Sequence, residues 1–336
     1  AEFEIRFFTS VPFPEALKNQ IRAALTGTTE QVCALNYDLG RWYAEAVKTV
    51  LADNNPGPID LIGSHGQTIH HISGHSTLQV GEPSFLAQAT GIPVVSDFRA
   101  ADVAAGGTGA PLIPRIDEWL FRVPGSAHIA LNIGGVANVT LLPQSGTGTV
   151  SGFDTGPGMA LLDETWRREF GAGFDASGEL AATGEVNEKL VREWLEDDFI
   201  PARPPKSTGR DKYGPTWLEQ HQGELAQLPV ADRLATLAAF TADSIYVNCR
   251  LFLAEYPVDC LIVGGGGVHH GPLQVRLATR FAPAVVVTSA DFGVDPDAKE
   301  ALGFALLAAA FVKGIPGNLP AVTGAARPVI LGKLSV

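Results

Sequence analysis

The first third of the chain alternates between strand-like and helical patterns of hydrophobic residues. Apolar and polar side chains alternate over residues 2–8, which predicts a strand. Apolar residues with helical spacing predict helices over residues 14–24, 31–51 and 83–90. Short apolar runs predict strands over residues 59–62, 78–80 and 92–95. Strands that alternate with helices indicate an α/β fold with a largely parallel sheet.

A second pattern begins near residue 128. Three strands are predicted over residues 129–132, 137–142 and 150–153, and a helix opens at Gly156–Gly158 and runs to Phe170. This is a β-β-β-α unit with glycines at its turns. The remaining patterns predict helices over residues 230–256, 272–281 and 299–312, and strands over residues 260–263 and 284–288. Residues 204–209, rich in proline, are expected to form a surface loop or lid.

Composition indicates a globular protein of about two domains. The chain has 336 residues, of which 46% are hydrophobic and 18% charged, and its net charge is −12. Because no cluster of Lys or Arg offsets this acidity, nucleic acid and an anionic membrane are poor candidates as partners. The apolar run 301–312 is too short to span a bilayer. A negatively charged ligand would therefore need backbone N–H groups, a cation or a few well-placed basic side chains.

The cysteines and histidines do not indicate disulfides or a metal site. Three widely spaced cysteines without a CxxC pair are typical of reduced thiols in a cytosolic protein. Four histidines lie between residues 65 and 75, but neither their spacing nor any flanking cysteine pair favours zinc. His269 and His270 are interpreted as a pair of loop residues.

Three glycine-rich turns each follow an apolar strand, at residues 132–135, 154–158 and 264–267. Glycine at the end of a strand lets backbone N–H groups approach a phosphate, and the start of a following helix favours the anion. Each turn on its own could equally be a tight turn without a ligand. None matches a P-loop or a dinucleotide-binding GxGxxG motif. Three such turns together favour a phosphate-binding site.

Asp154 stands where a buried strand meets the Gly-Pro-Gly turn. A carboxylate there could take a proton from water or from a sugar hydroxyl beside an incoming phosphate. The same position also suits a carboxylate that caps a helix. Its position alone leaves the two interpretations open.

Two polar loops, residues 63–68 and 106–111, gather side-chain donors and acceptors between glycines. They could form the walls of a cleft for a polar ligand such as a sugar, or a loop network that satisfies itself. Asp295, Asp297 and Glu300 crowd the start of the last long helix, where acidic residues favour the helix dipole. Glu300 could instead point into a cleft and hydrogen-bond a substrate.

Several stretches, in order along the whole chain, resemble the motifs of the anhydro-N-acetylmuramic acid kinase family. These stretches are Ile62–Thr68, Leu78–Pro83, Asp97–Arg99 with Asp102, Ala105–Leu112, Leu131–Asn138, Phe153–Gly158, Gly264–Gly267, Asp295–Ala301, Gly317–Pro320 and Val322–Ala325. The resemblance implies the two-domain fold of sugar kinases, Hsp70 and actin, which is ribonuclease H-like and has a central cleft between the domains. The first domain would hold residues 1–124 and 293–336, and the second residues 125–292.

The resemblance also implies a reaction. ATP and water would open the ring of 1,6-anhydro-N-acetylmuramic acid while O6 is phosphorylated, giving N-acetylmuramic acid 6-phosphate and ADP in the recycling of cell-wall peptidoglycan. Magnesium would accompany ATP, although the resemblance assigns no residue to the metal. The protein would be a cytoplasmic homodimer whose ligands are a small sugar and ATP.

Residue roles follow from the same resemblance. Asp154 would be the base that activates the attacking water, and Glu300 would lie close to the sugar. Further sugar-binding residues would be Ser64, His65, Gln67 and Gly107. The ATP-binding residues would be Asn132, Gly134, Gly135, Thr155, Gly156, Gly264, Gly265, Gly266 and Gly267.

The chain departs from the family in two places. The family begins with a strand and a Gly-Thr-Ser-x-Asp-Gly turn, the first phosphate loop, and residues 1–336 contain no copy of it. Because the sequence starts at Ala1 and its one methionine is Met159, we expect an incomplete sequence, with a truncated homologue as the alternative. Met159 also stands where the family usually has asparagine, which removes an amide beside the turn of Asp154.

Two other functions remain open from the sequence. A homologue without the first phosphate loop could bind a sugar or nucleotide and catalyse nothing. Another sugar kinase of the same fold could phosphorylate an ordinary hexose, without any need for an anhydro bridge.

Overall fold

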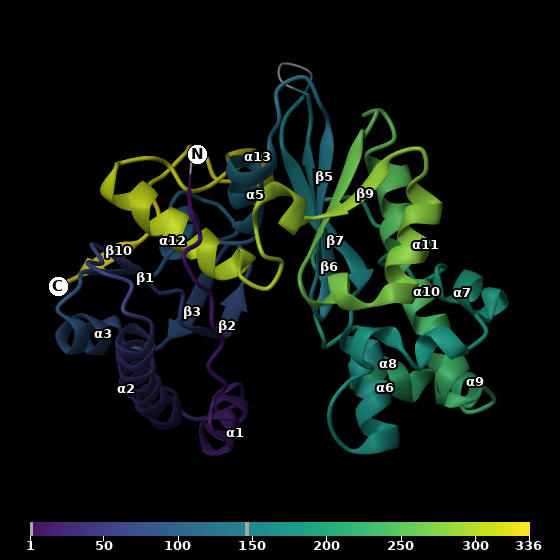
Figure 1. Ribbon diagram of the computed structural model, residues 1–336, viewed down its shortest axis with the longest axis horizontal. Coiled ribbons are helices and arrows are strands. Elements are labelled where there is room, and N and C mark those ends of the chain that lie inside the picture. The colour runs from purple at the N-terminus through teal and green to yellow at the C-terminus, as the bar shows by residue number, and fades with distance from the viewer. Residues whose placement is uncertain (1–2, 145–147) are drawn as a thin grey trace. The chain divides into compact units, whose positions relative to one another are not determined.

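The structure is a computed structural model that describes residues 3–144 and 148–336 (Figure 1). The chain divides into two compact units: unit 1 lies within Ala1–Ile116 and Glu300–Val336, and unit 2 within Asp117–Lys299. The boundaries fall inside two helices, α5 (Ile113–Phe121) and α12 (Lys299–Val312). The domain limits expected from the sequence, at residues 124 and 293, remain a prediction. The two units are described separately.

Unit 1 contains two small sheets. β1 (Ile62–Gly63) pairs in parallel with β4 (Val94–Ser96), and β10 (Lys333–Ser335) pairs antiparallel with the other edge of β4. β2 (Gln67–Ile72) and β3 (Ser76–Val80) form an antiparallel hairpin. Besides parts of α5 and α12, the helices of this unit are α1 (Glu15–Ala24), α2 (Thr29–Asn54), α3 (Pro83–Thr90), α4 (Ala100–Ala104) and α13 (Pro320–Thr323).

Helix α2 has clear local signals at both ends. The Gln31 N–H donates to the Thr28 hydroxyl at 3.3 Å, and the Thr28 N–H donates to the Gln31 side chain at 2.8 Å, which forms a capping box. Asn55 ends the helix in the left-handed conformation, with φ 43°. Between these ends, Leu35 and Leu39 are buried in a core that also contains residues of the β2–β3 hairpin. The predicted helix is confirmed, with one more turn at its C-terminal end.

Two expectations for unit 1 are wrong. The strand expected over residues 2–8 does not form: residues 3–8 carry no regular secondary structure, and Glu2 lies outside the described residues. Phe3 and Ile5 are half-buried, while Glu4 and Arg6 are exposed. The alternation of apolar and polar residues therefore reflects burial of one side of this segment, although the segment pairs with no strand among the described residues. The polar stretch 63–68 is not wholly a loop, because its last two residues begin strand β2.

Unit 2 is built on a five-stranded sheet in the order β7-β6-β5-β8-β9. Its strands are β5 (His128–Ile133), β6 (Val136–Leu142), β7 (Ser151–Pro157), β8 (Cys260–Gly264) and β9 (Val285–Thr288). The first three are antiparallel neighbours, whereas β5, β8 and β9 run in parallel. This order and these directions are ribonuclease H-like, and the predicted α/β fold class is confirmed. The expectation of a largely parallel sheet is wrong for this unit, because β5, β6 and β7 pair antiparallel.

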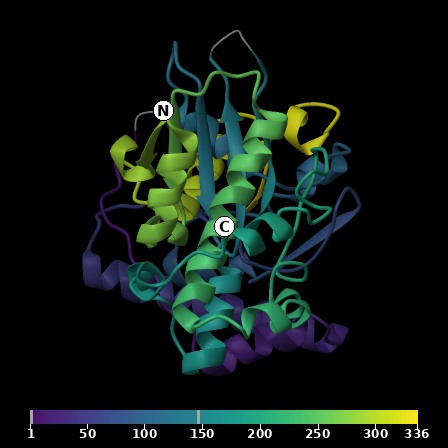
Figure 2. The ribbon, with the colours of Figure 1, turned by 90° about the vertical axis from the view of Figure 1, so that its right-hand side faces the viewer.

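One face of this sheet packs on two long helices, α10 (Val230–Phe252) and α11 (Gly271–Phe281) (Figure 2). Alternate residues of β5–β7, such as Leu131, Val139 and Phe153, are buried against Ala242 and Ile245 of α10. Small residues on α10 allow the helix to approach the sheet closely. The intervening residues of the strands face the opposite side.

A second core of unit 2 lies among helices that the sequence patterns did not indicate. Besides α6 (Ala160–Phe170), which was predicted, it includes α7 (Glu188–Trp194), α8 (Pro215–Gln220) and α9 (Gln222–Leu225). Trp194, Trp217 and Phe240 pack together, with ring centroids 5.1–5.6 Å apart. These helices are too short to show a hydrophobic period, so only tertiary packing on aromatic residues identifies them. In the part of the chain that the structure describes, no helix is both long and apolar enough to cross a membrane.

A buried ion pair joins the two ends of unit 2. Asp117 and Lys299, its first and last residues, are 1% and 2% exposed, and the Lys299 Nζ lies 2.7 Å from Asp117 Oδ1. The other carboxylate oxygen accepts a hydrogen bond of 2.7 Å from the hydroxyl of Thr140 on β6. Because removal of one partner leaves a buried charge uncompensated, this pair holds the ends of the unit to its sheet.

We expect Lys299→Met to lower the free energy of unfolding by about 3–5 kcal/mol, because Asp117 then stays buried without its cation. Urea unfolding followed by circular dichroism measures this loss. Lys189→Met is the matched control: Lys189 forms an exposed pair with Glu193, so its replacement should cost less than about 1 kcal/mol. Equal effects of the two substitutions would contradict the role of the buried pair.

Candidate active site

Four residues form one row across the sheet of unit 2. Gly264 pairs with Asn132, Asn132 with Asn138, and Asn138 with Asp154. Directly paired residues place their side chains on the same face of a sheet. The three polar side chains are partly exposed, whereas the residues on either side of each are buried. The strand pairing thus brings two predicted residues, Asn132 and Asp154, into one polar row with Asn138 between them.

A β-bulge sets this alignment. The pairing of β6 with β7 shifts between Ala137 and Asn138, which leaves Thr155 without a partner on β6. Thr155 is fully buried, and its hydroxyl donates to the Ala137 carbonyl at 3.2 Å. Any contact of Thr155 with a nucleotide would therefore involve its backbone. The next residue, Gly156, has φ 132°, a conformation that favours glycine.

Asp154 is held by a loop that approaches β7 from outside the sheet. The Asp154 N–H donates to the Lys206 carbonyl at 3.3 Å, and the Thr208 N–H donates to Asp154 Oδ2 at 2.9 Å. Burial raises the pKa of Asp154 to about 6, and the Thr208 N–H and the Lys206 charge offset only part of this rise. A carboxyl with such a pKa can accept and release a proton near neutral pH.

The side chain of Lys206 ties the same loop to the backbone at Phe199 and Ile200. Its ammonium donates to the carbonyls of Phe199 and Ile200, at 2.9 Å each, and lies 4.6 Å from the centroid of the Phe199 ring. Burial lowers the pKa of Lys206 to about 8, although the nearby charge of Asp154 opposes this change. The stretch expected to be a loop or lid therefore touches the predicted base directly.

The turn between β5 and β6 packs against the start of helix α6. The N–H groups of Gly158 and Ala160 donate to the Gly135 carbonyl, and the Met159 N–H donates to the Gly134 carbonyl, at 2.8–3.1 Å. A Cβ on Gly158 would lie only 2.3 Å from the Gly134 carbonyl oxygen, so this contact requires glycine. The side chain of Met159 packs against both hydrophobic cores of the unit.

The glycine run after β8 packs on the end of β5. A Cβ on Gly265 would lie 2.9 Å from Asn132 Oδ1, and a Cβ on Gly267 only 2.4 Å from Ile133. Gly264 takes its place in the polar row, and the space in front of Gly266 is open. The run is therefore a close-packed turn in which Gly266 faces free space.

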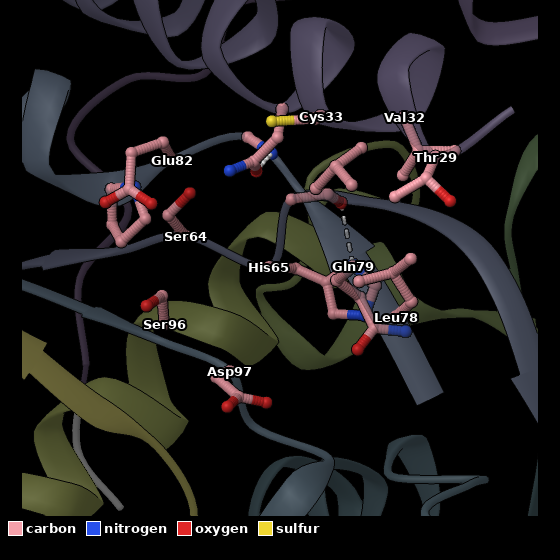
Figure 3. A pocket seen from close by; sticks show the side chains of 15 residues that line it. Thr29, Val32, Cys33, Ser64, His65, Leu78, Gln79, Glu82, Ser96 and Asp97 are labelled. Atoms are coloured by element: carbon pink, nitrogen blue, oxygen red, sulfur yellow. Dashed lines mark hydrogen bonds between the residues drawn. The ribbon is translucent and has the colours of Figure 1, made fainter. Parts of the chain in front are cut away.

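In unit 1, two predicted sugar-binding residues line a cavity of about 370 Å³. Figure 3 shows Ser64 and His65 in this cavity, with Thr29, Val32 and Cys33 of α2 on one side and Ser96 and Asp97 on the other. Among the described residues, its lining does not include Gln67, Gly107 or Glu300. The cavity therefore brings together only part of the predicted set.

Arg99 connects three of the predicted sugar-binding elements. Its Nε–H donates to Nε2 of His65 at 3.0 Å, and its Nη1 donates to the Gly109 carbonyl at 3.0 Å. The charge of Glu300 acts on the same guanidinium. Arginine can only donate, so Nε2 of His65 is the acceptor and the proton sits on Nδ1, which donates to the Gly66 carbonyl at 2.9 Å. Burial and the charge of Arg99 lower the pKa of His65 to about 4.

Asp102 holds the predicted sugar-binding glycine loop. It is fully buried and accepts hydrogen bonds from Gly109 N–H at 2.8 Å and from Asn318 and Thr323 side chains at 2.7 Å each. A Cβ on Gly107 would lie 2.3 Å from Asp102 Oδ2, so the glycine allows the carboxylate to approach the loop. Gly107 is thus packed on Asp102. The side-chain amide of Gln67 donates to the neighbouring Thr68 carbonyl at 3.2 Å.

The described residues contain neither a cluster of metal ligands nor a disulfide. Within residues 3–144 and 148–336, no group of three or more His, Cys, Asp or Glu could hold a metal ion. The three cysteines are unpaired.

The sequence did not predict four of the residues that shape these sites. They are Asn138 in the polar row, Lys206 and Thr208 in the loop that contacts Asp154, and Arg99 in unit 1. The alternation of polar and apolar residues on β6 could have indicated Asn138, whereas the loop contacts had no signal in the sequence.

Comparisons with known proteins agree with the resemblance. The family model described as anhydro-N-acetylmuramic acid kinase matches residues 3–336. Relatives with that name occur in Caldanaerobacter subterraneus (40% identical over 99% of this chain and 89% of the relative) and Salinibacter ruber (41%, 98% and 87%). A ROK family glucokinase structure from Streptomyces griseus is 14% identical with a TM-score of 0.37, covering 79% of this chain and 87% of its own.

We expect the His65 imidazole to stay neutral, with its proton on Nδ1, at every pH above about 5, because its pKa is lowered to about 4. Two-dimensional ¹⁵N NMR of the histidine side chains reports both tautomer and charge. The same side chain in urea-unfolded protein is the control, since free imidazole titrates near pH 6.5. Titration of folded His65 above pH 6 would contradict the Arg99 contact.

We expect Asp154→Asn to stabilise the protein increasingly from pH 4 to about 6 and then by a constant amount. The folded pKa of Asp154 lies above the unfolded value of 3.8, so wild type loses stability as this carboxyl ionises. The difference in unfolding free energy should grow by at most about 3 kcal/mol. Urea unfolding between pH 4 and 8 measures it, and a difference that does not change with pH would contradict the raised pKa.

Proposed function

The chain belongs to the anhydro-N-acetylmuramic acid kinase family, and from this membership we propose that it phosphorylates 1,6-anhydro-N-acetylmuramic acid with ATP. The products would be N-acetylmuramic acid 6-phosphate and ADP, which suits the recycling of cell-wall material. The observation that carries the proposal is a partly exposed carboxylate with a raised pKa, Asp154, in a polar row beside two glycine turns.

Asp154 is the proposed general base. It takes a proton from a water molecule whose oxygen attacks the anomeric carbon, and the bond from that carbon to the bridging oxygen breaks. The oxygen released at C6 then accepts the γ-phosphoryl group of ATP, and ADP leaves. A base is most effective when its pKa lies near the working pH, and burial brings Asp154 to about 6. The Thr208 N–H keeps the carboxylate oriented.

Gly134 and Gly135 are proposed to hold phosphate groups, with Asn132 and Gly156 close to them and the backbone of Thr155 behind. The residues fit a nucleotide because the turn has no Cβ and because Asn132 links it to the glycine run at Gly265. Gly264–Gly267 would border the adenosine. Mg²⁺ fits as part of Mg-ATP, since it commonly uses phosphates, water and only one or two carboxylates. When bound, it would offset phosphate charge.

Unit 1 is proposed to bind the sugar. Ser64 and His65 line its cavity, while Gln67, Gly107 and Glu300 retain the roles that the family motifs imply. Because both ring nitrogens of His65 are already engaged, its proposed part is to shape the cavity. We further propose that the two domains have the limits 1–124 with 293–336 and 125–292, and that the protein is a cytoplasmic homodimer, as the family resemblance implies.

The test is a mass-spectrometric assay with Mg-ATP, 1,6-anhydro-N-acetylmuramic acid and H₂¹⁸O. We expect a phosphorylated sugar with one heavy oxygen at C1, because water attacks the anomeric carbon. Asp154→Asn should lower the rate about 10²–10⁴-fold, the usual contribution of a general base.

Asp198→Asn is the matched control, since Asp198 is an exposed carboxylate in the same unit. It should keep the wild-type rate. Sugar binding without ADP formation would instead support a binding protein, and phosphorylation of an ordinary hexose would support another sugar kinase. Full activity of Asp154→Asn would exclude Asp154 as the base.

A further inference from the structure

The Arg210 guanidinium lies directly on the glycine turn between β5 and β6. The position that a Cβ of Gly135 would occupy is 2.8 Å from Arg210 Nε and 3.1 Å from its Nη2. Gly135 does not have a positive φ, so its conformation is open to other residues. The absence of a side chain at this position leaves room for the guanidinium.

Within the described residues, no carboxylate forms an ion pair with Arg210. Among the described residues, none forms a hydrogen bond or ion pair with its side chain, and the side chain is exposed. The charge of Arg210 acts on Asp163 of α6: burial raises the pKa of this carboxyl, and Arg167 and Arg210 offset part of the rise. By contrast, Arg276 and Arg280 are bound to Asp243.

The backbone on both sides of Arg210 is fixed. Before it, Thr208 is bonded to Asp154. After it, the N–H groups of Lys212 and Tyr213 donate to the Gly209 carbonyl, at 3.2 and 2.9 Å, and Tyr213 is fully buried. A Cβ on Gly214 would lie 2.1 Å from the Arg210 carbonyl oxygen, so this stretch is closely packed. Arg210 is thus an exposed side chain on a well-anchored loop.

We propose that Arg210 is a catalytic residue that binds the phosphoryl group in transfer. This inference rests on the proposed function and names its phosphate-binding side chain. The planar guanidinium offers several N–H donors that suit the non-bridging oxygens of a phosphate. From its place on Gly135, it binds these oxygens while the bond to ADP breaks and the bond to the sugar oxygen forms. An arginine that stabilises the transferred phosphoryl group commonly contributes a large part of the rate.

The loop would then serve both halves of the reaction. Thr208 orients the base that acts on water, and Arg210, two residues later, binds the group that moves to the sugar oxygen. In a chain with 36 acidic and 24 basic residues, an arginine at this turn with no ion-pair partner among the described residues is a suitable partner for a polyanion.

The first test compares Arg210→Met with Arg203→Met, an exposed arginine in the segment before this loop. We expect Arg210→Met to lower kcat at least 100-fold and Arg203→Met to change it less than twofold. Calorimetry with ADP and with a non-hydrolysable ATP analogue gives a second readout. Arg210→Met should bind ADP as wild type does and lose at least tenfold in affinity for the analogue. Arg210→Lys should restore only part of either loss.

A double-mutant cycle with Gly135→Ala makes the test specific to the contact. The methyl group should displace the guanidinium, so Gly135→Ala should lower kcat in wild type by a clearly larger factor than in Arg210→Met, where only its direct effect on the phosphate groups is left. Thermal unfolding of each variant separates these effects from loss of fold.

The outcomes distinguish the inference from the proposed function. Additive effects in the cycle, or unchanged kcat and analogue affinity in Arg210→Met, would overturn the role of Arg210. A wild-type protein that makes no phosphorylated sugar would contradict the proposed function. The comparison of ADP with the analogue would still test whether Arg210 binds the terminal phosphate.

Discussion

The hydrogen-bonded register of β5, β6 and β7 is the constraint on which the candidate active site depends. In a strand, a slip by one residue exchanges the two faces. The bulge that leaves Thr155 unpaired keeps Phe153 in the core and Asp154 on the open face, opposite Asn138. The hydrophobic contacts of Phe153 with α10 and its neighbours stabilise this register. The position of the proposed base thus follows from packing on the other side of the sheet.

Burial raises the pKa of the Asp154 carboxylate, and contacts with a loop offset part of that rise. Taking a carboxylate out of water raises its pKa, while one backbone N–H and one nearby ammonium keep it available in the ionised form. The same loop presents Arg210 to the glycine turn, so one segment would supply the orientation of the base and the positive charge for a phosphate. This combination explains how an acidic chain can handle a polyanion without a basic surface.

Unit 1 follows a similar principle with different residues. Asp102 and Arg99 need hydrogen-bond partners in the interior, and both contact the glycine loop. Asp102 connects the loop to side chains more than 200 residues away in the sequence, and Arg99 connects it to His65. Neutral donors satisfy the Asp102 carboxylate, whereas Arg99 fixes the tautomer of His65. Glycines such as Gly107 are required there because a carboxylate approaches the backbone. These contacts within the protein hold the glycine loop.

The sequence by itself determined the α/β class, the β-β-β-α order of unit 2, the long helices and the glycine turns that follow β5 and β8. These features have local causes: hydrophobic period, caps and residues that permit tight turns. The third expected turn, over residues 154–158, was wrong, because strand β7 continues to Pro157. Ordered motifs also indicated Asp154 and the family. Tertiary structure alone decided that residues 3–8 form no strand and that Asn138 joins Asp154. It also decided that Arg99 and Thr208 reach their hydrogen-bond partners and that Arg210 lies against Gly135. Strand pairing and loop contacts join residues distant in sequence, so no local pattern records them.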